Sequence, residues 1–202
     1  MKTILHLNSS IFGQAGQSSR LAQEFVAQFP EARVFIRDLG TRPLPHLDAE
    51  RFGAFLAKPE SRTPTQQTVI NESDALIAEL RQADTLVLGL PMYNFGVPSQ
   101  LKAYFDHVAR AGVTFKYTEK GAVGLLTGKK AYVFAARGGL YQGSPRDTQT
   151  GYVREFLAFL GITDVEFVYA EGLAISEASK AESLARAQRS LRSLAQPERI
   201  AA

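Results

Sequence analysis

Residues 85–95 read Thr-Leu-Val-Leu-Gly-Leu-Pro-Met-Tyr-Asn-Phe. The run before Pro91 is apolar almost without interruption, as is typical of a central β-strand that is covered on both faces. The proline ends the strand, and two aromatic side chains and an amide follow closely behind it. Ligands of open α/β sheets bind just beyond the carboxyl ends of the strands, so this junction predicts a binding loop at residues 91–95.

Strand and helix patterns alternate along the rest of the chain, which indicates a parallel sheet with crossover helices. We therefore predict an α/β fold with a flavodoxin-like, doubly wound, five-stranded parallel sheet in the order 2-1-3-4-5 and helices on both faces. That order places the loops after the first and third strands beside each other. Residues 112–128 are expected to form a loop excursion. The five strands are expected at residues 2–8, 33–37, 85–90, 130–136 and 165–170.

The composition is that of an ordinary globular protein, and we expect one domain over residues 1–202. The net charge of +3 is too small to indicate a nucleic-acid partner. The absence of cysteine excludes disulfides, thiolate catalysis and cysteine-ligated metal centres. No histidine and carboxylate spacing resembles a metal site. The sequence shows neither an export signal nor an apolar run of about 18 residues, so we expect no membrane span and a cytoplasmic protein.

The loop after the first strand, residues 8–19, carries hydroxyls and amides and leads into a helix that Ser18 or Ser19 is expected to cap. Free amides at a helix start favour an anion. The loop has neither the Gly-Lys-Ser/Thr of a triphosphate-binding loop nor the GxGxxG of a dinucleotide site. A site for a phosphate monoester, such as that of flavin mononucleotide (FMN), fits it better. An ordinary polar loop with a serine cap fits it too.

Two further loops carry related signals. In residues 91–95, Met92 and Phe95 offer apolar contact and Asn94 both donates and accepts hydrogen bonds, a mixture that suits the edge of a flat heterocycle. Arg137-Gly138-Gly139 follows the fourth strand, where paired glycines let backbone amides approach a ligand closely. Each loop alone also fits a structural role, the first as a strand terminator and the second as a tight turn. Their shared position after strands one, three and four favours a cofactor site.

Three stretches resemble the FMN-dependent NADH-azoreductase family of the flavodoxin-like NAD(P)H:quinone oxidoreductase superfamily. They are Pro91-Met-Tyr-Asn-Phe-Gly-Val-Pro-Ser-Gln-Leu-Lys102, Ala111-Gly-Val-Thr-Phe-Lys-Tyr-Thr-Glu-Lys-Gly121, and residues 124–139 from Gly-Leu-Leu-Thr-Gly-Lys-Lys to Ala-Arg-Gly-Gly. Gly161-Ile-Thr-Asp164 and Ala170-Glu-Gly172 support the match. The resemblance covers essentially the whole chain.

The resemblance implies a homodimer with one FMN per subunit at the interface and NADH or NADPH as electron donor. Ala136 stands where the family often has serine, and Gly16 where serine or asparagine is common, which implies a larger share for backbone amides in holding FMN. Tyr117 and Phe159 are the candidates for a substrate lid, one of them from the partner subunit. The implied cofactor-binding residues are Ser10, Gly16, Gln17, Ser18, Pro91, Met92, Tyr93, Asn94, Phe95, Ala136, Arg137, Gly138 and Gly139.

The implied activity is a ping-pong, two-electron reduction of azo compounds and quinones by NAD(P)H, in which the flavin carries the hydride and no catalytic side chain is needed. One alternative is a quinone reductase with incidental azo activity. Another is a flavodoxin-type electron carrier. The mild positive charge and the 111–128 excursion favour an enzyme over such a carrier, and a non-catalytic regulatory domain on the same fold is a third possibility.

Overall fold

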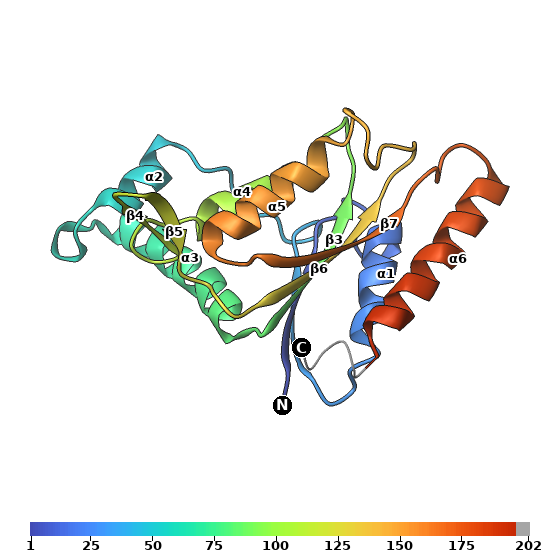
Figure 1. Ribbon diagram of the computed structural model, residues 1–202. Coiled ribbons are helices and arrows are strands. Elements are labelled where there is room, and N and C mark those ends of the chain that lie inside the picture. Colours follow the sequence, from blue (N-terminus) through green and yellow to red (C-terminus); the bar gives the residue numbers. More distant parts are fainter. Residues whose placement is uncertain (197–202) are drawn as a thin grey trace.

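The computed structural model describes residues 1–196, which form a five-stranded parallel sheet between two layers of helices (Figure 1). The sheet order is β2-β1-β3-β6-β7, which confirms the predicted order 2-1-3-4-5 of the five parallel strands. Strands that are neighbours in the sheet pair in parallel, for example at Ile4 with Thr85 and at Gly89 with Phe134. The strands are β1 (Thr3–Asn8), β2 (Arg33–Asp38), β3 (Thr85–Pro91), β6 (Lys130–Ala136) and β7 (Asp164–Ala170).

Helices cover both faces of the sheet because its side chains alternate between two apolar clusters. Ile4 and Val87 pack with residues of α1 (Gln17–Val26) and α6 (Glu177–Leu194). Leu5 and Leu88 belong to the opposite cluster, with residues of α3 (Pro64–Gln82), α4 (Ser99–Val108) and α5 (Thr148–Leu160). Every residue of β3 is buried, as its uninterrupted apolar sequence predicts.

The starts of the helices follow local sequence signals. Asp48 accepts a hydrogen bond from the Arg51 amide at the start of α2 (Ala49–Leu56), the usual role of aspartate at a helix N-cap. Thr63 and Gln66 form a capping box at the start of α3. Asp147 caps α5 by accepting from the Thr150 amide, and Gly161 ends that helix with φ of 101°. Two short 3₁₀ segments, Gly13–Ala15 and Pro59–Ser61, complete the helical part.

The segment expected to be a loop excursion contains an antiparallel hairpin of β4 (Phe115–Thr118) and β5 (Gly121–Gly124). The hairpin packs against the carboxyl end of α5, where the rings of Phe115 and Phe159 lie 4.2 Å apart (Figure 1). Its strands have four residues each and are mostly exposed, so they lack the alternating apolar pattern that identifies longer strands. The loop prediction was therefore wrong for these residues.

Among the described helices, none combines the length and apolar character that crossing a membrane requires.

Candidate functional site

The structure brings the three sequence-predicted loops together at the carboxyl edge of the sheet, because β1, β3 and β6 are neighbours. The Tyr93 hydroxyl lies 3.3 Å from the Ser10 hydroxyl and accepts a hydrogen bond of 3.2 Å from the Ile11 amide. The Met92 amide donates to the Ala136 carbonyl at 3.1 Å. These bonds join the loop after β3 to both of its neighbours.

Helix α1 begins at Gln17 with Gly16 as its N-cap, so the expected serine cap was wrong. Ser18 and Ser19 instead occupy the second and third positions of the helix, where both side chains are buried. Within residues 1–196 neither hydroxyl has a hydrogen-bond partner. Gly16 carries no side chain to supply a cap, and the loop geometry starts the helix one residue before the serines.

Close packing explains why glycine occupies position 16. A Cβ atom there would lie 2.3 Å from the Ser10 hydroxyl oxygen and 2.7 Å from the Ser10 Cβ. Ser10 is itself fixed, because it is buried and its hydroxyl accepts a hydrogen bond from the Phe12 amide at 3.2 Å. Gly16 thus keeps the entrance to α1 open beside Ser10, and a larger residue at this position requires the loop to move.

The first turn of α1 has the properties of an anion site. The first amides of a helix have no intrahelical acceptor, and the helix dipole adds partial positive charge there. Residues 17–20 are Gln-Ser-Ser-Arg, so the turn itself carries no carboxylate that would oppose an anion. The Ser18 hydroxyl in this turn is buried and has no hydrogen-bond partner within residues 1–196. A phosphate monoester matches this set of donors.

His6 lies beneath this loop on β1 and is buried. Burial lowers its pKa from 6.5 to about 4, and hydrogen bonding to Asn8 and the charge of Asp38 oppose this effect only in part. The imidazole is therefore neutral at physiological pH, as burial in a core strand favours.

Residues 93–96 form a tight turn with an uncommon backbone. Asn94 and Phe95 have φ of 49° and 63°, the left-handed region that favours glycine. The Tyr93 and Gly96 residues close the turn by exchanging hydrogen bonds of 3.2 and 2.9 Å. Phe95 is 50% exposed, and its ring meets that of Tyr141 edge-on at 5.6 Å. The turn thus presents an amide and an aromatic ring to solvent at the sheet edge.

The Arg137 side chain is completely buried and engaged by other protein groups. Its guanidinium donates to Glu171 at 3.0 Å and to Asp147 at 2.8 Å. Burial alone would raise the pKa of Asp147, but hydrogen bonds from Arg137 and Thr150 outweigh it and lower the pKa. The Glu171 carboxylate also accepts from the amides of Tyr141 and Gln142. The charge of Arg137 thus fixes the loop after β6. The guanidinium is used by protein groups, so the backbone of this loop is the part that can contact a ligand.

Gly138 and Gly139 keep their amides available. Their carbonyls accept from the amides of Ala174 and Gly172, at 3.0 and 2.9 Å. In the described part of the chain neither glycine N–H donates a hydrogen bond. A Cβ at Gly139 would lie 2.6 Å from the Tyr141 hydroxyl oxygen, so a larger residue there requires the Tyr141 side chain to move.

Tyr117 and Phe159 lie apart from these loops within one chain. Phe159 is near the carboxyl end of α5, whereas the loops meet its amino end, about 15 Å away at 1.5 Å per residue. Tyr117 is 75% exposed on the hairpin that packs beside Phe159. The structure therefore brings the two lid candidates near each other but not near residues 92–95.

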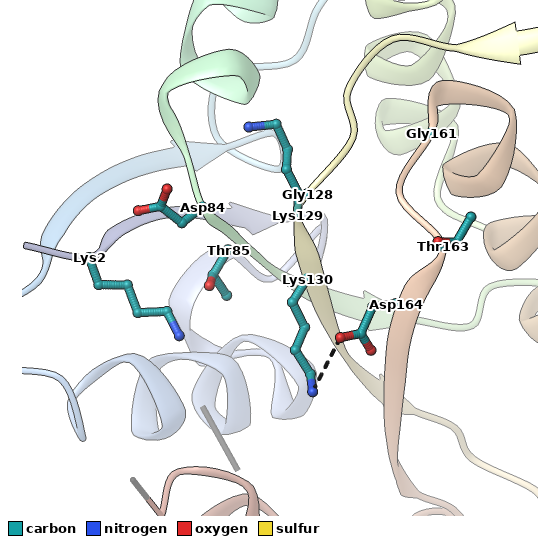
Figure 2. A pocket seen from close by; sticks show the side chains of 9 residues that line it. All are labelled: Lys2, Asp84, Thr85, Gly128, Lys129, Lys130, Gly161, Thr163 and Asp164. Atoms are coloured by element: carbon teal, nitrogen blue, oxygen red, sulfur yellow. Dashed lines mark ion pairs between the residues drawn. The ribbon is translucent and has the colours of Figure 1, made fainter. Parts of the chain in front are cut away.

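A cavity of about 420 Å³ lies at the opposite, amino edge of the sheet (Figure 2). The Lys129 ammonium donates to the carbonyls of Arg81 and Ala83 at the end of α3. Figure 2 shows Lys130 paired with Asp164, at 3.4 Å. These charges tie strand starts to their neighbours, so we assign this cavity a structural role. No group of three His, Asp or Glu side chains in residues 1–196 is suited to a metal ion.

Sequence reasoning missed four residues of this edge, namely Tyr141, Asp147, Gln149 and Glu171. Each is an ordinary residue in a loop or helix start, and only the fold brings it to the site. The Glu171 signal was present in the Ala170-Glu-Gly172 stretch, but nothing in the sequence pairs it with Arg137.

Comparisons with known proteins agree with this geometry. A family model described as a flavodoxin-like fold matches residues 2–195. The chain is 54% identical over 190 residues to the FMN-dependent NADH:quinone oxidoreductase of Cellvibrio japonicus strain Ueda107, a match covering 92% of this chain and 96% of that protein. It is 53% identical over 192 residues to the protein of the same name from Alcanivorax borkumensis strain SK2, covering 93% and 97%.

Solved structures give the same result. The azoreductase from Bacillus anthracis strain Sterne superimposes with a TM-score of 0.88 at 27% identity, covering 96% of this chain and 99% of that chain. An FMN-dependent NADH-azoreductase from Bacillus anthracis strain Ames Ancestor, in complex with FMN, has a TM-score of 0.84 at 26% identity, covering 97% and 100%. The chain therefore belongs to the flavodoxin-like fold family, in the group that contains the FMN-dependent NADH:quinone oxidoreductases and NADH-azoreductases.

Proposed function

We propose that this protein is an FMN-dependent NADH:quinone oxidoreductase that also reduces azo compounds. The observation that carries the proposal is the first turn of α1, where backbone amides and the buried Ser18 hydroxyl are placed for an anion, beside the turn of residues 93–96. The curated relatives at more than 50% identity carry the name of this activity, and a structural neighbour contains FMN.

The donor set at α1 suits the FMN phosphate. The amides of Gln17 and Ser18 and the Ser18 hydroxyl would hold its oxygens, and Ser10 would border them through its own hydroxyl. Gly16 leaves room for the phosphate because a side chain there would press on Ser10. Charge-assisted bonds to a dianion repay the burial of a hydroxyl that has no partner within residues 1–196.

The remaining two loops suit the ring and the ribityl chain. Met92 and Phe95 would supply apolar contact, and Asn94 would both donate to and accept from the polar edge of the ring. The amides of Gly138 and Gly139 would donate at the opposite side and stabilise negative charge there. When bound, FMN supplies two-electron hydride chemistry that the side chains of this protein lack.

The protein's part in the reaction is to bind FMN and the substrates, to orient them and to exclude water. No general acid or base is needed from the site, because bound FMN would carry the electrons. Arg137 is paired with carboxylates, and His6 is neutral. We propose a ping-pong order, in which NADH gives up its hydride and leaves as NAD⁺ before the acceptor takes the same position. A quinone then takes up two electrons and two protons. An azo bond takes up four of each, in two rounds, to give two amines.

We propose that the protein acts as a homodimer with FMN at the interface. Large apolar side chains are exposed around the carboxyl edge and on the hairpin, among them Phe12, Leu140 and Tyr117. Since Tyr117 and Phe159 lie far from the loops of their own chain, they would reach an FMN ring only across such an interface. Analytical ultracentrifugation of the FMN-loaded protein would give a dimer, and a monomer with full activity would contradict this part.

The function is tested by loading the protein with FMN and adding NADH without oxygen. The proposal expects the yellow absorbance near the flavin maximum to bleach without any partner protein and to return on adding 1,4-benzoquinone. Methyl red would also restore it, with release of aromatic amines. A protein that binds FMN but is not bleached by NADH is an electron carrier. A protein that does not bind added FMN is neither a flavin-dependent oxidoreductase nor an electron carrier.

A further inference from the structure

The turn of residues 93–96 is held in a conformation that its own sequence disfavours. Two consecutive residues with side chains, Asn94 and Phe95, adopt positive φ angles. Such a backbone persists only where the surroundings impose it. The hydrogen bonds between Tyr93 and Gly96 close the turn but do not fix its direction relative to the sheet. Other residues must therefore set where Asn94 and Phe95 point.

The first turn of α5 supplies that constraint. Gln149 is completely buried, and its Nε2 donates to the carbonyls of Pro91 at 2.9 Å and Gly96 at 2.8 Å. The Pro91 carbonyl lies at the end of β3, just before the turn, and the Gly96 carbonyl belongs to the last residue of the turn. The Thr148 hydroxyl donates to the Phe95 carbonyl between them. Three backbone carbonyls, those of Pro91, Phe95 and Gly96, are thus anchored from one helix start, 53 to 58 residues further along the chain.

The same helix start also anchors the opposite loop. Asp147, the cap of α5, accepts from the Arg137 guanidinium at 2.8 Å and from the Thr150 amide at 3.1 Å. Arg137 begins the segment that carries Gly138 and Gly139. A movement of residues 147–149 would therefore shift the turn after β3 and the loop after β6 together.

We propose that the first turn of α5 sets the distance and angle between the two ring-facing loops, with Gln149 as the positioning residue for Asn94 and Phe95. A glutamine is needed because an apolar side chain of the same size would leave two carbonyls without their donor. The proposal rests on the proposed function, since it assigns these loops to the flavin ring. It goes further by assigning a role to Gln149, which would not touch the ring itself but would control the affinity for the flavin.

The test is Gln149→Met, which keeps the length of the side chain and removes both donated bonds. Gln82→Met, at an exposed position at the end of α3, is the matched control. In the unliganded protein, hydrogen exchange of the Gly96 amide should be about tenfold faster or more in Gln149→Met than in the control, because the turn it closes is no longer anchored. Equal exchange rates in the two variants would overturn the proposal.

Ligand binding gives the second measurement. Gln149→Met should weaken FMN and riboflavin by the same factor, about tenfold or more, because the ring contacts are misplaced and the phosphate contacts are not. A loss confined to FMN would contradict the proposal by locating the effect at the phosphate. Failure of the wild-type protein to bind FMN would instead count against the proposed function, while the exchange experiment would still test the turn.

Thr148→Val covers the case in which Gln149→Met does not fold. Thr148 is exposed, so its replacement by an isosteric side chain leaves the core intact. Loss of its bond to the Phe95 carbonyl should change Gly96 exchange and riboflavin affinity in the same direction and by a smaller factor. No change in either quantity would count against the proposed role of α5.

Discussion

The start of α1 and the loop after β6 lie at the same edge of the sheet, but their buried polar side chains differ in whether they have hydrogen-bond partners. At α1 the buried hydroxyls of Ser18 and Ser19 have no partner within residues 1–196. After β6 the guanidinium of Arg137 is paired with both Asp147 and Glu171. Burying a polar group is unfavourable unless it is hydrogen-bonded. The first region therefore suits a ligand that completes it, whereas the side-chain charges of the second are paired without one.

Because of this difference, substitutions in the two regions should affect different quantities: the stability of the unliganded protein after β6 and the binding of a phosphate at α1. Replacing a residue of the Arg137 network should unfold the protein more easily, with or without FMN. Replacing Ser18 should leave the unliganded protein nearly as stable and weaken the binding of a phosphate.

The largest effect is expected for Glu171→Ala. It leaves the completely buried Arg137 with one carboxylate partner and frees the amides of Tyr141 and Gln142. Breaking a buried ion pair from one side costs about 3–5 kcal/mol, so the free energy of unfolding should fall by about that amount. Urea denaturation of the unliganded protein measures it, with Glu155→Ala on the exposed side of α5 as the control. A fall as small as that of the control would show that the pairing with Asp147 suffices.

A pH-dependent effect of intermediate size is expected from His6, which lies under the α1 loop. Its folded pKa, about 4, is below the ordinary value of 6.5, so the unfolded chain binds the proton more tightly. The stabilising effect of a neutral imidazole is complete above pH 6.5 and is lost as the pH falls toward 4, by roughly 3 kcal/mol at most. His6→Gln should flatten this pH dependence in urea denaturation series, whereas the exposed His46→Gln should not. Equal slopes for both variants would refute the assignment.

A smaller effect, on binding alone, is expected for Ser18→Ala. A hydrogen bond to a charged group is worth about 1.5–3 kcal/mol, so FMN affinity should fall by about tenfold to a hundredfold. Riboflavin, which has no phosphate, should bind both proteins equally in a fluorescence titration. The free energy of unfolding of the unliganded protein should stay the same or rise slightly, because a buried hydroxyl without a described partner is removed. An equal loss for riboflavin would place Ser18 elsewhere than at the phosphate.

The smallest effect is expected for Phe95→Gly. Phe95 has φ of 63°, and glycine adopts that angle without the steric cost that a bulky residue bears. The unliganded protein should be more stable by up to about 1 kcal/mol, while flavin binding weakens through the loss of the aromatic contact. Thermal unfolding with and without FMN compares the two effects. A variant that is destabilised without FMN would show that the contact between Phe95 and Tyr141 outweighs the strain.

Much of this architecture could be predicted from the sequence because its signals are local. The apolar run of residues 85–90 and the Asp48 cap both appear in the structure where their patterns place them. The hairpin at residues 115–124 was missed, since four-residue strands with exposed side chains have no distinctive period. The serine cap was misplaced because Gly16, which has no side-chain signal of its own, takes the capping position.

The residue pattern alone was enough for the alternation of strands and helices, because runs of apolar residues are local signals. It did not fix the order of the strands, which was taken from the flavodoxin-like arrangement and is set by the packing of strands that lie far apart in the chain. The sequence does not show which polar side chains lack protein partners and are available to a ligand. Arg137 and Ser18 are both polar residues after a strand, yet one is enclosed by Asp147 and Glu171 and the other is not. That distinction arises only when segments 10 to 34 residues or more apart are packed together, since a hydrogen bond depends on distance in space and not along the chain.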